Sequence, residues 1–125
     1  MEFDEVLKSR RSIRNFKKKK VSESKLLEIA DAGRYAPSAG NLQNWKFLIL
    51  TKNLDKLFDD FYSKAAAVIV VINDKNDILM EYKEKGNEFS QQSCGAVIQN
   101  MLLKATDLGI GSCWVGSFED RDLRA

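Results

Sequence analysis

The stretch "RRSIRNF", residues 10–16, holds the densest group of side chains suited to binding a ligand. It places Arg10, Arg11 and Arg14 within five positions, with Ser12 between them. A guanidinium presents a planar fork of donors that matches phosphate oxygens, and a serine hydroxyl can complete such a cradle. Arginines also complement the partial negative charge at the end of a helix. Taken alone, the stretch favours this helix-end interpretation, and phosphate binding is the alternative.

The overall composition excludes several classes of function. The 125 residues carry 20 basic and 18 acidic side chains and no histidine. This balance argues against a nucleic-acid or membrane partner, and the lysine run at 17–20 lacks the interleaved aromatics of a single-strand platform. Without histidine, Ser-His and Cys-His triads are impossible. We expect no metal site, because Cys94 and Cys113 are too few for structural zinc.

The same two cysteines indicate the cellular compartment of the protein. They lie far apart in a chain with no recognisable signal peptide, so we expect reduced thiols that belong to the core and a cytoplasmic location. No stretch approaches the ~18 consecutive apolar residues of a membrane span.

Hydrophobic periodicity predicts the elements that must position these residues in the first half of the chain. Apolar side chains at helical spacing predict a helix over 2–11, whose last turn carries the arginines. A second helix is predicted over 22–35, with Ser22 as its N-cap. Pro37, the only proline, opens a loop. The alternation in "WKFLIL" then predicts a strand over 45–50.

The second half alternates strands and helices. A helix is predicted over 54–63, and the uninterrupted apolar run at 65–73 indicates a strand covered on both faces. Residues 74–86 are predicted as a mobile loop or a short helix. The longest helix is predicted over 88–108, and "SCWVGSF" at 112–118 as a further strand and turn. Gly109 suits the left-handed position that ends a helix.

The predicted helix 88–108 indicates the assembly. It is apolar over most of its circumference, so it must be buried on several sides. A single domain of 125 residues has few elements for that purpose. We therefore predict a homodimer. The order of elements predicts an α+β or α/β fold around a mixed sheet.

Three stretches in register resemble one known family. They are "RRSIRNF", "APSAGNLQNWKFLIL" and "GAVIQNMLLKATDLGIGSCWVGSF", and together they resemble the nitroreductase family of flavoproteins. The resemblance implies an α+β fold with a mixed, largely antiparallel central sheet flanked by helices in three layers. It also implies a homodimer with two FMN sites at the subunit interface. We therefore expect residues 1–125 to form a single FMN-binding domain that lacks the C-terminal part of the family fold.

The resemblance also assigns the arginine stretch. Arg10, Arg11 and Ser12 would bind the FMN phosphate and ribityl chain. Arg14 would lie near N1 and the O2 carbonyl of the flavin, where positive charge favours the reduced form.

Two other segments would contact the flavin by the same resemblance. A loop of small residues would approach it from the other subunit, because small side chains are needed where backbone lies against a flat ring. Gly116 and Ser117 would lie near flavin N5. An ordinary loop and a turn glycine are the alternatives. The loop residues are Pro37, Ser38, Ala39, Gly40 and Asn41.

The activity that the resemblance implies is electron transfer through FMN. The protein would take hydride from NAD(P)H and pass it to a nitroaromatic, a quinone or a related small electron-poor acceptor, and no side-chain acid or base is needed. The alternative is a truncated, non-catalytic flavin-binding or dimeric interaction protein of the same fold. The chain departs from the family at Asn44, where the family usually has proline, which indicates a less rigid loop.

Overall fold

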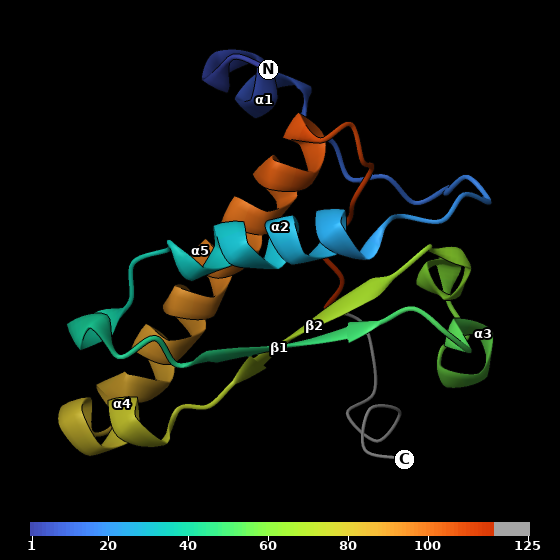
Figure 1. The fold of residues 1–125 in the computed structure, drawn as a ribbon. Coiled ribbons are helices and arrows are strands. Elements are labelled where there is room, and N and C mark those ends of the chain that lie inside the picture. The colour runs from blue at the N-terminus through green and yellow to red at the C-terminus, as the bar shows by residue number, and fades with distance from the viewer. Residues whose placement is uncertain (117–125) are drawn as a thin grey trace.

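The computed structural model describes residues 1–116 of the chain. Figure 1 shows the long helix α5 running through the molecule, with α2 crossing it and a pair of strands beside it. No helix within residues 1–116 is both long enough and apolar enough to span a membrane. The elements are α1 (Phe3–Ser9), α2 (Glu23–Arg34), the 3-10 turn η1 (Ala39–Asn41), β1 (Trp45–Leu50), α3 (Leu54–Leu57), the 3-10 turn η2 (Phe61–Lys64), β2 (Val68–Asn73), α4 (Asn76–Tyr82) and α5 (Lys85–Asp107).

The sheet in the described part of the chain consists of β1 and β2. They pair antiparallel, in a register that runs from Trp45 opposite Asn73 to Leu50 opposite Val68. These strands and the surrounding helices confirm the predicted α+β class with antiparallel pairing. One expectation is wrong here: the strand predicted as covered on both faces leaves Ile72 42% exposed, because within residues 1–116 the helices pack on the opposite face.

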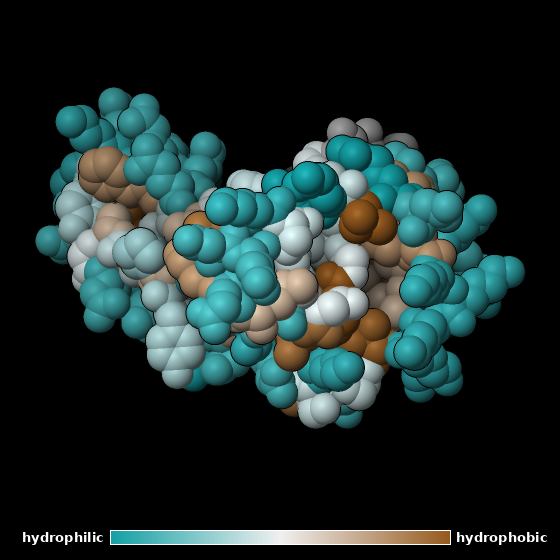
Figure 2. Space-filling view, turned by 90° about the horizontal axis from the view of Figure 1, so that it is seen from above, coloured by the Kyte–Doolittle hydropathy of each residue, from teal (hydrophilic) through white to brown (hydrophobic). Residues whose placement is uncertain are grey.

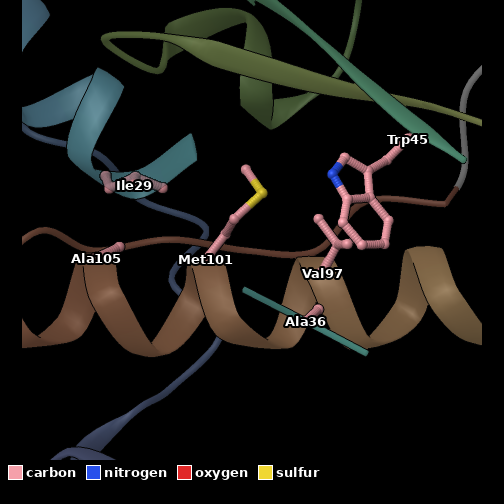
Figure 3. Close-up of a cluster of buried hydrophobic side chains, with 6 residues drawn as sticks. All are labelled: Ile29, Ala36, Trp45, Val97, Met101 and Ala105. Atoms are coloured by element: carbon pink, nitrogen blue, oxygen red, sulfur yellow. The ribbon is translucent and has the colours of Figure 1, made fainter. Parts of the chain in front are cut away.

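The main core lies between α2, α5 and the strands. Figure 3 shows Val97 and Met101 projecting from α5, with Ile29 of α2 and Trp45 of β1 nearby. Val97 is fully buried and Met101 is 7% exposed. Elements of the same chain therefore cover much of α5, including Val97 and Met101. The homodimer stays a prediction.

The ends of the helices follow the sequence signals. Ser22 caps α2, because its Oγ accepts a hydrogen bond from the backbone N–H of Lys25 at 3.4 Å. Helix α5 ends at Asp107, and Gly109, two residues later, has φ 76°. The N–H of Gly109 donates to the carbonyl of Thr106 and the N–H of Ile110 donates to the carbonyl of Ala105, which satisfies two terminal carbonyls. Both predicted helix ends are confirmed.

The helix predicted over 54–63 is wrong in its second half. Backbone dihedrals at Phe58 are extended, so α3 stops there and the 3-10 turn η2 follows. The carboxylate of Asp60 accepts the N–H of Phe61 at 2.7 Å. Aspartate competes for backbone donors inside a helix and favours a cap, which explains the break.

Two further segments refine the predictions. Residues 74–86 contain a short helix, α4, whose Ile78 is fully buried, and α5 starts at Lys85 rather than at residue 88. Over 112–116 the structure has one bridging residue, Ser112, in place of the predicted strand. The rest of that predicted strand and turn lies outside the described residues.

Candidate functional site

The arginine stretch lies at the C-terminal end of α5. After α1, Ser12 forms a parallel bridge with Ser112, and the N–H of Ile13 donates to the carbonyl of Ser112 at 2.9 Å. The amino group of Met1 forms an ion pair with Asp107 at 3.1 Å. These contacts attach the chain's first residue to the last residue of α5, and the arginine stretch to the segment that follows α5.

The three arginines have different surroundings. Arg11 Nη1 donates to the carbonyls of Lys8 at 2.9 Å and Arg10 at 3.1 Å, so its guanidinium serves the end of α1. Arg10 is half-buried and Arg14 is exposed. Arg14 lines a shallow cavity of about 320 Å³ together with Asp59 and other residues of that turn. The helix-end interpretation therefore holds for Arg11.

Ser112 is a candidate that the sequence analysis missed. Its Oγ is buried and has no hydrogen-bond partner within the described residues. Its backbone contacts the arginine stretch, so an unpaired polar atom lies beside Ser12. The available signal was a second serine in a glycine-rich segment next to Gly111. Of the predicted pair Gly116 and Ser117, the first is exposed with open space around it, and the second lies outside the described residues.

The loop before β1 forms a tight turn with unusual backbone angles. Gly40, Asn41 and Gln43 all have positive φ, at 59°, 55° and 50°. Glycine and asparagine tolerate this region, whereas glutamine rarely adopts it. The N–H of Gln43 donates to Ser38 Oγ at 3.0 Å, and Gln43 Nε2 donates to Asn41 Oδ1 at 3.1 Å. These bonds link Gln43 to Ser38 and Asn41 within the turn.

This loop lies at the other end of α5 from the arginines. A Cβ placed on Gly40 would lie 2.9 Å from Tyr82 Oη, and the Tyr82 ring packs edge-on against Phe89 of α5. Between Phe89 and Asp107, α5 rises about 27 Å. Figure 1 shows the two segments at opposite ends of the helix. Within one chain, the two segments therefore lie near opposite ends of α5.

An apolar cavity of about 910 Å³ opens beside the arginine stretch. Its walls include α2, α5, β2 and the segment 109–116, and they are completed by Ile13, Asn15 and Phe16 of the stretch. Figure 2 shows hydrophobic residues gathered around a hollow on this side of the molecule. Its charged lining residues are all lysines, at 17, 19, 20 and 25. The arginine end of α5 therefore combines positive charge with apolar surface.

The two cysteines lie on α5 and in the segment that follows it. Cys94 is half-buried against the main core, and burial raises the pKa of its thiol. Cys113 is also half-buried. Within residues 1–116, no three His, Cys, Asp or Glu side chains gather where they could hold a metal ion.

Comparison with known proteins identifies the class of this chain. The model of the Nitroreductase family matches residues 7–63 and 51–125. The crystal structure of a nitroreductase family protein from Clostridium difficile 630 is similar with a TM-score of 0.86 and 29% identity, over 99% of this chain and 73% of that one. The chain therefore belongs to the nitroreductase family and has the fold predicted from its motifs.

Individual relatives extend this finding. The chain is 35% identical over 120 residues to a protein of Archaeoglobus fulgidus named "Putative NADH dehydrogenase/NAD(P)H nitroreductase". A solved nitroreductase with bound FMN, from Bacteroides fragilis NCTC 9343, has a TM-score of 0.75 and 28% identity over 92% of this chain and 70% of that one. The match to the Archaeoglobus fulgidus protein covers 90% of this chain and 66% of that protein. The chain thus spans about two thirds of the length of such curated relatives.

Proposed function

We propose that this protein is an FMN-dependent oxidoreductase that takes hydride from NAD(P)H and reduces a small electron-poor acceptor such as a nitroaromatic or a quinone. Family membership supports the reaction class, and the Bacteroides fragilis relative was solved with FMN. The observation that carries the proposal is the separation of the arginine stretch and the loop along α5. Two chains are needed to bring both segments to one flavin.

The arginine stretch fits the phosphate end of FMN. Arg10 and Ser12 supply a guanidinium and a hydroxyl, and the buried, unpaired Ser112 Oγ adds a polar group next to them. Arg11 would contribute by releasing a carbonyl of α1 that it now binds. Arg14 is exposed and directed to the same side as Asp59, and we assign it to the flavin head.

The loop fits the flat ring of FMN. Ser38, Ala39 and Gly40 present small side chains, so backbone can approach a planar ligand closely. Gly116 offers the same open access at the end of the described chain. We assign Pro37 and Asn41 to the same contact surface, and Ser117 to the neighbourhood of Gly116.

The chain itself would act by binding and orientation. When bound, FMN supplies hydride and electron transfer between the nicotinamide and the acceptor. Guanidinium groups stabilise negative charge on the phosphate and on the reduced ring. No histidine is needed as an acid or base, in agreement with its absence from the sequence.

A two-fold dimer would place the two segments together twice. In an isologous pair the same surface of each chain meets the other, so antiparallel α5 helices bring the arginine end of one chain beside the loop end of its partner. The pair then holds two equivalent sites. A partner would also cover apolar side chains that are exposed in one chain, such as Trp114 at 51%.

The test is to purify the protein, add FMN, and record its visible spectrum, its mass in solution and its NAD(P)H oxidation with a quinone. We expect a yellow dimer that consumes NAD(P)H only when an acceptor is present. A flavin-bound dimer without turnover would instead support the second candidate, a non-catalytic flavin-binding protein. A protein that binds no FMN would contradict both.

A further inference from the structure

We infer that Asn44 is the positioning residue that holds the loop 37–43 in its turn, through a buried carboxamide that ties the loop to β2 and α5. Asn44 is 4% exposed and lies between the loop and the start of β1. The inference rests on the proposed function only for its effect on FMN; the effect on the loop stands on the contacts themselves.

The carboxamide of Asn44 bonds to both neighbouring elements. Its Nδ2 donates to Asn73 Oδ1 at 2.8 Å, at the end of β2, and to the carbonyl of Ser90 at 3.2 Å, in α5. Cys94 Sγ lies 3.6 Å from the same nitrogen. The backbone carbonyl of Asn44 accepts the N–H of Asp74 at 2.7 Å. One residue thus fixes the loop's exit to two elements of the core.

The partners of Asn44 are themselves bonded. Asn73 Nδ2 donates to Ser90 Oγ at 3.0 Å, and Ser90 Oγ donates to the carbonyl of Asn87 at 2.9 Å. Ser90 is fully buried. Because every member is tied to the next, the position of the Asn44 side chain is closely defined.

The backbone beside Asn44 explains why such an anchor is needed. Gln43, the residue directly before it, is left-handed at φ 50°. A residue other than glycine or asparagine keeps this conformation only where its surroundings determine it. Proline at 44 would push Gln43 toward extended dihedrals, so asparagine is compatible with this turn and proline is not.

An unpaired atom in the same side chain points to a specific role. Asn44 Oδ1 is buried with no hydrogen-bond partner within the described residues. A buried orphan acceptor is destabilising, and an apolar side chain would avoid it. The donor contacts of Nδ2 therefore account for a polar residue at this position, and what they hold is the loop.

The experiment compares Asn44→Ala with a matched control, Asn100→Ala. Asn100 Nδ2 donates to the carbonyl of Ala32 at 3.2 Å, so this control also removes one partly buried bond to backbone, between α5 and α2. For both variants we would measure amide hydrogen exchange along the whole chain and the FMN dissociation constant. Asn73→Ala, which removes one acceptor of Asn44, is the second test variant if Asn44→Ala does not fold.

We expect Asn44→Ala to speed exchange within residues 38–43 and to weaken FMN binding, each by about tenfold or more, because it removes the hydrogen bonds from Asn44 to Asn73 and to Ser90. Exchange in α2 and at the C-terminal end of α5 should match that of the unchanged protein. Asn100→Ala should leave exchange in the loop unchanged and should bind FMN like the unchanged protein. Unchanged exchange in the loop, or equal acceleration everywhere, would overturn the inference. Faster loop exchange with unchanged FMN affinity would uphold it and count against the proposed flavin contact.

Discussion

The two ends of α5 are built on different principles. At the C-terminal end, the arginine stretch is attached by a few backbone bonds to Ser112 and leaves Arg14 exposed in solvent. At the other end, the loop forms a strained turn fixed by the buried carboxamide of Asn44. The arginine end is therefore suited to recognise charge with adaptable side chains, and the loop end to present a fixed shape.

The core between the two ends should be the most sensitive region. Met101→Glu would bury a charge where Met101 packs with Ile29 and Ala105, so we expect a loss above about 3 kcal/mol in the free energy of unfolding and loss of both ends together. Urea denaturation measures this change in the free energy of unfolding. Gln99→Glu, on an exposed position of α5, is the control and should change stability by less than about 0.5 kcal/mol. A Met101→Glu chain as stable as the original would show that the described core is wrong.

The loop end can be disturbed alone by Gly40→Ala. A methyl group there meets Tyr82 Oη at 2.9 Å and must adopt a positive φ, so about 1–2 kcal/mol of strain is expected, with weaker FMN binding. Adding Tyr82→Phe removes the hydroxyl, so the double variant should recover the part of the lost stability that comes from the contact with Tyr82 Oη. Isothermal titration with FMN and thermal unfolding give the two quantities. If Gly40→Ala binds FMN as before, the loop is not part of the site.

The arginine end can be examined one side chain at a time. Arg10→Ala should weaken FMN binding by about 1.5–3 kcal/mol, the usual worth of a charge-assisted hydrogen bond. Arg14→Ala should mainly make the flavin harder to reduce, and Arg11→Ala should have the smallest effect on FMN because Arg11 binds carbonyls of α1. The dissociation constant for FMN and the reduction potential of the bound flavin, measured for each variant, distinguish the three arginines. If the flavin reduction potential of Arg14→Ala is unchanged, Arg14 does not contact the flavin head and belongs with the residues that bind the phosphate.

The smallest effect concerns the ion pair that ties α1 to α5. The amino group of Met1 holds the pKa of Asp107 below its ordinary value. The contribution of the ion pair to stability is therefore present above about pH 4 and is lost as the pH falls through the lowered pKa of Asp107. Stability curves against pH should show a slightly steeper acid loss for the original protein than for Asp107→Asn. Identical curves would mean that the pair contributes nothing.

Local signals predicted much of the fold. Ser22 and Gly109 mark the ends of their helices through bonds to residues three or four positions away, which sequence spacing reveals. The break at Phe58 was missed because a cap by Asp60 competed with helical periodicity. The anchor of Asn44 was missed for another reason: its partners lie 29 and 46 residues away in the chain, and only the folded structure brings them together.

The candidate site was predicted in part by the same logic. Family motifs selected the arginine stretch and the loop, but no local pattern shows that the two lie near opposite ends of α5. Ser112 was missed because a lone serine carries no signal until its Oγ is found buried without a partner.

The most direct test of the central claim, a flavin site shared between two chains, is subunit mixing. One chain carries Arg10→Ala and the other Gly40→Ala, and each alone should bind FMN weakly. After the two are unfolded and refolded together, random pairing should give mixed dimers with one intact site and one doubly altered site, so about a quarter of all sites should regain the original affinity. Recovery of those tight sites in an FMN titration is the predicted result. A mixture that binds no better than the two variants measured separately would contradict the shared site.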